Sequence, residues 1–167
     1  MTALKVREAR DDELDAAGEV VVQAYSAPGV LGDGGHGYLA YVRDARRRAR
    51  DCPVLVAVDQ DAGDLLGCVT YVPNEGNPFA ELEVEGEAGF RMLGVAVAAQ
   101  GRGVGRSLVE ACIDRARADG RRGLAISTGP GMTTAHRLYE RLGFLRAPDR
   151  DFEPVPGILL WAYVLPL

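Results

Sequence analysis

A glycine-rich turn constrains this chain more than any other feature. Residues 92–110 read MLGVAVAAQGRGVGRSLVE, which predicts a strand, a tight turn and then an amphipathic helix. A helix N-terminus presents unpaired N–H groups and the positive end of the helix dipole, so it suits a phosphate. Glycines let a bulky anion approach the backbone and arginines add charge beside it, so the turn predicts a site for a pyrophosphate or similar anion. The residues concerned are Gly101, Gly103, Gly105, Arg102 and Arg106.

The spacing of these glycines excludes two common nucleotide sites. A Walker A loop needs GxxxxGK[ST], but here Gln100 takes the place of the first glycine and Arg106 that of the lysine. A dinucleotide fingerprint, GxGxxG, counted from Gly101 also meets Arg106 where its last glycine should be. Taken alone, the glycines leave open a tight turn that binds nothing.

Composition and charge narrow the class of protein. With 167 residues, 47% of them hydrophobic, the chain is predicted to form one domain, residues 1–167, with a substantial core. The net charge of −5 argues against a nucleic-acid partner. The three cysteines, Cys52, Cys68 and Cys112, form no CxxC pair, so we expect neither a disulfide framework nor a metal site.

The chain carries no membrane or export signal that we recognise. Its N-terminus is charged and lacks the apolar core of a signal peptide. The longest apolar stretch, residues 157–167, is too short to span a bilayer. We therefore expect a soluble cytoplasmic protein without a membrane partner.

Periodicity and turn residues predict a mixed α/β order. Helices are expected at 11–26, 38–51, 104–120 and 132–144, and strands at 4–9, 53–59, 64–72, 124–128 and 157–165. The stretch 81–97 is unusual in composition, and a further strand is expected at its end, directly before the glycine turn. The glycine-rich segment 28–37 is expected to be a loop. The five arginines between Arg43 and Arg50 are expected on a solvated helix face, and His136 is also expected to be exposed.

Two motifs in order carry a family resemblance. QGRGVG at 100–105 matches the pattern [QR]xxGx[GA], and AHRLYERLGF at 135–144 resembles AxxLYExxGF, about 30 residues later. With FRMLGVAV before them, they resemble the GNAT superfamily of acetyl-CoA-dependent N-acetyltransferases. The resemblance implies a single domain with a central mixed sheet of about six or seven strands, about four flanking helices and a splayed central strand.

The same resemblance implies an activity. The chain would move an acetyl group from acetyl-CoA, its cosubstrate, to a primary amine by direct attack in a ternary complex. The acceptor, a small-molecule or peptide amine, would be selected by residues 26–40 and 145–157. A non-catalytic acyl-CoA-binding or interaction domain with the same fold is the alternative, and the resemblance leaves a homodimer open.

The resemblance also assigns cofactor contacts. Backbone groups of the central strand would hydrogen-bond the pantetheine arm, and the loop with the first turn of the helix would hold the pyrophosphate. The residues implied are Leu93, Val95 and Val97 on the strand, followed by Gln100, Arg102, Gly103, Val104, Gly105, Arg106 and Ser107.

Catalytic residues are predicted at two positions. Tyr139 matches the tyrosine of the LYE motif and is the candidate general acid, with simple core packing as the alternative. Glu87 is the candidate base, because Gly89 stands where relatives often carry Glu and Glu87 is one period-2 step away.

Two further features qualify this assignment. An extended backbone would place Glu81, Glu83, Glu85 and Glu87 on one side, where they could attract a cationic amine or form only an acidic edge. Met132 stands where many relatives carry Asn, which puts one cofactor or water contact in doubt.

Overall fold

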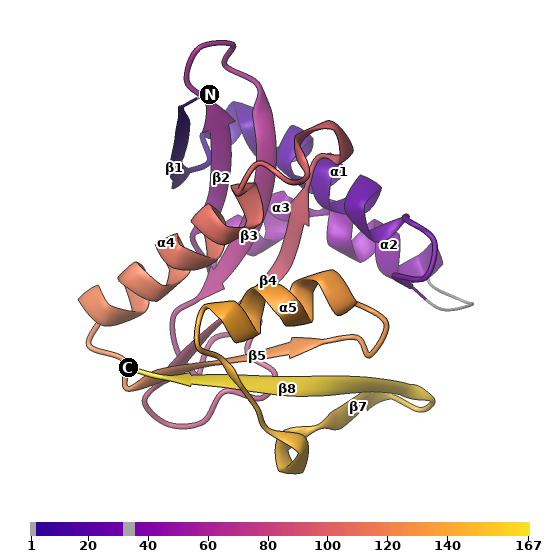
Figure 1. The fold of residues 1–167 in the computed structure, drawn as a ribbon, viewed down its shortest axis with the longest axis vertical. Coiled ribbons are helices and arrows are strands. Elements are labelled where there is room, and N and C mark those ends of the chain that lie inside the picture. Colours follow the sequence, from indigo (N-terminus) through magenta and orange to yellow (C-terminus); the bar gives the residue numbers. More distant parts are fainter. Residues whose placement is uncertain (1–2, 32–35) are drawn as a thin grey trace.

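A mixed β-sheet runs through the whole molecule in the computed structural model, which describes residues 3–31 and 36–167 (Figure 1). Its strand order is β1-β2-β3-β4-β5-β8-β6, and β7 pairs with β8. The strands are β1 Leu4–Glu8, β2 Val54–Asp59, β3 Leu65–Val72, β4 Glu87–Val95, β5 Gly123–Thr128, β6 Leu145–Arg146, β7 Phe152–Val155 and β8 Ile158–Pro166. The predicted mixed α/β class is confirmed, although the short strands β6 and β7 were not predicted.

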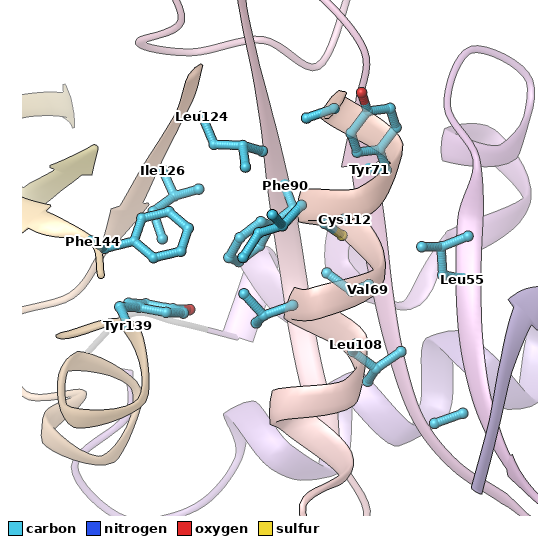
Figure 2. Packing of buried hydrophobic residues seen from close by; sticks show 14 of the residues in the cluster. Leu55, Val69, Tyr71, Phe90, Leu108, Cys112, Leu124, Ile126, Tyr139 and Phe144 are labelled. Atoms are coloured by element: carbon cyan, nitrogen blue, oxygen red, sulfur yellow. The ribbon is translucent and has the colours of Figure 1, made fainter. Parts of the chain in front are cut away.

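Helices cover both faces of the sheet. Helices α4 and α5 lie on one face, and α1, α2 and α3 lie on the other (Figure 1). The bounds are α1 Leu14–Tyr25, α2 His36–Arg43, α3 Ala45–Ala49, α4 Val104–Ala118 and α5 Thr133–Arg141. Each face has its own core cluster. Leu108, Ile126 and Tyr139 belong to the first (Figure 2), and Val21 and Met92 belong to the second.

The splay predicted for the central strand is confirmed. Strands β4 and β5 run parallel, and among the described residues they pair only at Glu87 with Gly123 and Ala88 with Leu124. Beyond that point the two strands diverge (Figure 1), whereas β4 keeps its antiparallel pairing with β3 on the other side. The backbone of β4 therefore has an edge without a strand partner in the middle of the sheet.

A β-bulge interrupts β4 where it diverges from β5. The β3–β4 register passes from Arg91 opposite Thr70 to Gly94 opposite Cys68, so β4 has one extra residue here. Met92 adopts a φ of 56°, which is uncommon for a residue with a side chain. The bulge turns Met92 into the cluster beneath α1, while Leu93 packs against the opposite cluster.

The segment 38–51 is two helices rather than the single one predicted. Asp44 breaks the run with a ψ of 68°, and its side chain accepts a hydrogen bond from the Arg47 N–H at 3.0 Å, as an N-cap does. The fully solvated arginine face predicted here is also wrong, because Arg48 is only 1% exposed. Its Nε donates to Thr70 Oγ1 at 3.0 Å, and this contact draws the side chain beneath β3.

Three remaining expectations concern cysteines, metals and membranes. Cys52, Cys68 and Cys112 are free thiols buried in the core. No cluster of three metal-ligating side chains occurs within residues 3–31 and 36–167. Over the same residues, none of the helices has the length and apolar character needed to cross a bilayer. Residues 32–35 of the loop predicted at 28–37 lie outside the described part of the chain.

Candidate active site

The glycine turn joins the end of β4 to the start of α4. After a short 3-10 turn, Val97–Ala99, the chain passes through Gly101 and Gly103 with φ values of 81° and 79°. These left-handed values favour glycine. A Cβ atom added at either position would meet nothing within 4 Å, so the space above the loop is open.

Unpaired N–H groups line this open space. Helix α4 begins at Val104, and Ser107 donates to the Gly103 carbonyl at 3.0 Å, which closes the first helical turn. The N–H groups before Ser107, those of the predicted pyrophosphate contacts, therefore have no acceptor within the helix. The arrangement suits an anion at the helix N-terminus.

The two loop arginines have acidic partners behind the loop. Arg102 lies 3.6 Å from Asp59 at the end of β2, and Arg106 pairs with Glu110 at 2.9 Å one helical turn later. Backbone hydrogen bonds from Ala62 and Asp61, together with Arg102, lower the pKa of the Asp59 carboxyl, which therefore stays charged. Asp59 thus holds the Arg102 guanidinium beside the loop, whereas Glu110 draws the Arg106 side chain along α4.

The predicted strand contacts fall into two groups. Leu93 and Val95 lie on the part of β4 that has diverged from β5, so their backbone groups can face the gap. Val97 lies beyond the end of the strand in the 3-10 turn, and its side chain is 66% exposed. Strand β4 therefore ends before Val97, which does not share the geometry of Leu93 and Val95.

Tyr139 is a residue of α5 and belongs to the core cluster of the face that α4 and α5 cover. Its ring packs against Phe90 and Phe144, with ring centroids 5.8 and 5.7 Å away, and the residue is 4% exposed. In the view of Figure 2 its hydroxyl is directed away from α5 toward α4. Burial raises the pKa of this phenol, so it carries its proton throughout the neutral range.

A cavity of about 650 Å³ opens on the other side of the splay. Its wall is built from the end of α1 and the segment after it, the β4 bulge, the end of β5, the loop before α5 and the β7–β8 hairpin. Parts of both regions expected to select the acceptor, 26–40 and 145–157, thus line it. Met132 belongs to this wall, at the N-cap of α5.

A single ion pair supplies the charge of this cavity wall among the described residues. Arg91 on the bulged part of β4 pairs with Glu81 at 2.8 Å, and both side chains are less than one-fifth exposed. Burial raises the pKa of the Glu81 carboxyl, while Arg91 and a hydrogen bond from Ser127 on β5 act in the opposite direction. Glu81 is therefore a stronger base than an exposed carboxylate.

Gly89 is the reason that Glu81 reaches this place. A Cβ atom at position 89 would overlap the Oε1 atom of Glu83, so the Glu83 carboxyl fills the space that a side chain on β4 would take. The other oxygen of Glu83 accepts from the N–H groups of Glu81 and Leu82 at 2.7 and 3.1 Å. The segment folds back over the sheet, and Glu81 lies one step further along it, beside Arg91.

The ladder of four carboxylates on one side of a strand is therefore wrong. Strand β4 begins only at Glu87, and the preceding residues form turns in which the Glu83 carboxylate accepts from the N–H groups of Glu81 and Leu82. Each carboxylate has a different environment: Glu85 is exposed, Glu83 covers Gly89 and Glu81 faces the cavity.

Glu87 is held in an ion pair away from the cavity. Its oxygens accept from Arg150 at 2.8 and 3.0 Å and from the Val84 N–H at 3.0 Å. Burial alone would raise the pKa of this carboxyl, but these hydrogen bonds outweigh it and the pKa is lowered. The arrangement gives Glu87 a structural part, and its catalytic role stays a prediction from the sequence.

His136 is buried, contrary to expectation. It is 7% exposed and stacks on Trp161 and Tyr163, with ring centroids 5.3 and 5.6 Å away. Its Nε2 atom lies 3.0 Å from the Gly129 carbonyl, so it fixes the loop that leads from β5 into α5. The aromatic partners come from β8, which the helix sequence alone does not reveal.

Sequence reasoning missed the pairing of Glu81 with Arg91 and the contribution of the β7–β8 hairpin to the cavity. Both depend on segments that meet only in the folded sheet, and no local pattern marks them. The available signal was Gly89 itself, a position without a side chain near the start of the strand.

Comparison with known proteins places this geometry in context. A family model described as the acetyltransferase (GNAT) family matches residues 21–144. No curated protein matches the chain. Among solved structures, a GCN5-related N-acetyltransferase from Kribbella flavida is 29% identical with a TM-score of 0.71, covering 99% of this chain and 98% of that one.

Two further structures resemble the fold and hold a ligand. A Salmonella typhimurium structure with its cofactor acetyl-CoA is 20% identical, with a TM-score of 0.67 and coverage of 99% and 94%. A GNAT family acetyltransferase from Brucella melitensis in complex with acetyl-CoA is 24% identical, with a TM-score of 0.65 and coverage of 100% and 90%. At these identities the likeness concerns the fold.

Proposed function

The chain belongs to the acetyltransferase (GNAT) family, and on this premise we propose that it transfers an acetyl group from acetyl-CoA to the nitrogen of a primary amine. The observation that carries the proposal is the meeting of three features. The unpaired edge of β4, the open loop at Gly101 and Gly103 and the N-terminus of α4 follow one another along a single segment. A long ligand with an amide-containing arm and a pyrophosphate fits that order of groups.

The residues of the loop would hold acetyl-CoA without metal or covalent attachment. The N–H groups from Arg102 to Arg106 would bind the pyrophosphate, with Gln100 and Ser107 at the two ends of the loop. Leu93 and Val95 would hydrogen-bond the arm through their backbone groups, as an added strand does. Bound acetyl-CoA would supply a thioester whose carbonyl carbon an amine can attack.

Tyr139 is the proposed general acid. Its raised pKa keeps the phenol protonated, so that its O–H is available to the departing thiolate. The proton then passes from the Tyr139 oxygen to sulfur, while the amine nitrogen keeps the acetyl group. Attack within one ternary complex needs no nucleophile from the chain.

Release of coenzyme A in the presence of amines tests this function. The protein is incubated with acetyl-CoA and a panel of primary amines, and free thiol is measured against a reaction without amine. Amine-dependent thiol release together with the acetylated amine is the expected result. No release above the amine-free rate would contradict the proposal.

A non-catalytic acyl-CoA-binding domain is the second candidate. It is favoured by one observation, that β4 carries no side chain at Gly89 and that Glu87 is tied to Arg150. The same assay separates the two functions, because a binding domain would bind acetyl-CoA but release no coenzyme A with any amine.

A further inference from the structure

We propose that the acceptor is a primary amine on an apolar body, and that Glu81 receives its ammonium group and takes its proton. This inference rests on the proposed function and names the substrate class of the same site. Three observations support it: the chemistry of the cavity wall, the place of the one carboxylate in it, and the way Gly89 positions that carboxylate.

The cavity wall is mostly apolar. Half of the exposed large apolar side chains of the described chain belong to it, namely Tyr38, Val155, Ile158 and Leu159, each between 37% and 53% exposed. Exposed apolar groups gathered around one opening mark a surface that a ligand covers. A volume of about 650 Å³ is that of a small-molecule site.

The charged side chains of the cavity wall suit an acceptor with a single ammonium group. Glu81 is the single carboxylate among the described lining residues, and Arg91 is the single cation. Arg91 also lies 3.5 Å from the Tyr41 hydroxyl and from the Phe79 carbonyl, neither of which belongs to the cavity wall. A polyamine would bring several positive charges to one carboxylate that is already paired.

Glu81 faces charged and titratable groups from each element around it. Arg91 comes from β4, Tyr38 from α2, and Glu83 from its own segment. Burial raises the pKa of Glu81 in the presence of all three, which makes it a better proton acceptor near neutral pH. Ser127 on β5 hydrogen-bonds this carboxyl and fixes it at the splay.

The proton and electron balance of the step is complete with Glu81 and Tyr139. Glu81 accepts a proton from the ammonium group, which frees the nitrogen lone pair. The nitrogen forms a bond to the thioester carbon, the carbon–sulfur bond breaks, and its electrons leave with sulfur. Tyr139 gives its proton to that sulfur. The nitrogen loses its second proton as the amide forms, and this proton restores Tyr139 through solvent, while Glu81 releases the proton that it accepted to solvent.

A matched amine panel tests the substrate class. Phenethylamine and hexylamine represent apolar amines, and ethanolamine and spermidine represent polar and polycationic ones. We expect kcat/KM to be at least tenfold higher for the two apolar amines, measured by thiol release. A preference for ethanolamine or spermidine would overturn the inference while leaving the proposed function in place. Acetyl-CoA binding without release by any amine would instead overturn the proposed function.

Substitution of Glu81 tests its role separately. Glu81→Gln is expected to lower kcat/KM at least 100-fold and to remove the fall in activity toward acidic pH, with acetyl-CoA affinity unchanged as the check on folding. Glu81→Asp keeps the charge and should recover part of the activity. Glu75→Gln is the control. Glu75 lies in the same segment between β3 and β4 but is exposed, so its substitution should leave kcat/KM and the pH profile unchanged. Full activity of Glu81→Gln with the wild-type pH profile would overturn the proposal.

A further variant tests the exposed apolar side chains of the cavity wall. Ile158→Ser should raise KM for hexylamine several-fold and leave both kcat and acetyl-CoA affinity unchanged, since Ile158 is 44% exposed and its loss spares the core. An unchanged KM accompanied by a change of oligomeric state would show that a second copy covers this surface, and would overturn the assignment of these side chains to the acceptor.

Discussion

At the scale of single residues, a substitution of Gly103 tests the proposed anion site of the loop most directly. Gly103 has a φ of 79° and is the N-cap residue of α4, and a Cβ atom added there would meet no other atom within 4 Å. Gly103→Asp should reduce acetyl-CoA affinity by about 100-fold or more, because a carboxylate would compete for the N–H groups and repel a pyrophosphate. Isothermal titration calorimetry measures the effect.

Gly120 offers the matched control for that substitution. It lies just after α4 with a φ of 69°, and a Cβ there would also meet nothing within 4 Å. Gly120→Asp therefore carries the same backbone strain at a site far from the loop. Equal losses of affinity in the two variants would show that strain, rather than the anion site, explains the result.

Tyr139 belongs to the same scale. Tyr139→Phe keeps the ring that contacts Phe90 and Phe144 but removes the proton that the phenol would donate. Turnover should fall about 100-fold or more while acetyl-CoA affinity stays the same. Steady-state kinetics and calorimetry on one sample check both values, and normal turnover would reduce Tyr139 to a packing residue.

At the scale of elements, the crossing of α1 and α2 depends on Gly18. A Cβ at this position would overlap the carbonyl oxygen of Arg43, the last residue of α2. Alanine would gain about 1 kcal/mol of helix propensity, but a main-chain atom cannot turn aside as a side chain can. Gly18→Ala should therefore lower the free energy of unfolding by about 1–3 kcal/mol in urea. The exposed Gln23→Ala on the same helix should be close to neutral.

The junction between β1 and α1 gives a prediction for acid stability. Glu13 accepts two hydrogen bonds from Arg7, at 2.7 and 2.8 Å, which together with the Arg10 N–H lower the pKa of this carboxyl to about 2. A lowered pKa means that the stabilisation is complete above the ordinary value near 4.5 and is lost as the pH falls through about 2.

Glu13→Gln removes this carboxyl and should therefore remove the pH-dependent stabilisation that it provides. The free energy of unfolding at pH 7 should fall by about 1–3 kcal/mol, and the difference from wild type should shrink between pH 4.5 and 2. Urea titrations at several pH values provide the measurement. A difference that stays constant over this range would mean that the carboxyl is not held as described.

The elements also show how far sequence reasoning reaches. The β2–β3 hairpin, the turn at Gly101 and Gly103 and helix α4 were predicted because their patterns are local. The segment before β4 was predicted wrongly, since alternating glutamates look the same in a strand and in turns. The conformation of this segment depends on the space above Gly89, which the Glu83 carboxyl occupies only after the chain has folded.

Buried polar residues were the other class that could not be predicted. Arg48 lies in a run of arginines typical of a solvated face, yet Thr70 on β3 draws it into the interior. His136 likewise depends on Trp161 and Tyr163, which reach it from β8. In both cases the partner is distant in sequence, so the helix pattern contains no sign of it.

At the scale of the whole molecule, the splay brings the two proposed sites together. The glycine loop and Tyr139 belong to the face covered by α4 and α5, while Glu81 lines the cavity, whose wall includes the β4 bulge and the end of α1. Strand β4 belongs to both, because its bulge turns Met92 and Leu93 to opposite sides. The proposed cofactor site and the proposed acceptor site thus meet where β4 and β5 separate.

Calorimetric titration with acetyl-CoA, with ATP and NAD titrated into the same sample, tests this account most directly. All three ligands carry phosphates, but only acetyl-CoA combines a pyrophosphate with an arm that can pair with the free edge of β4. We predict micromolar binding of acetyl-CoA and no response to ATP or NAD. Absence of acetyl-CoA binding by the folded protein, or equal binding of all three, would contradict it.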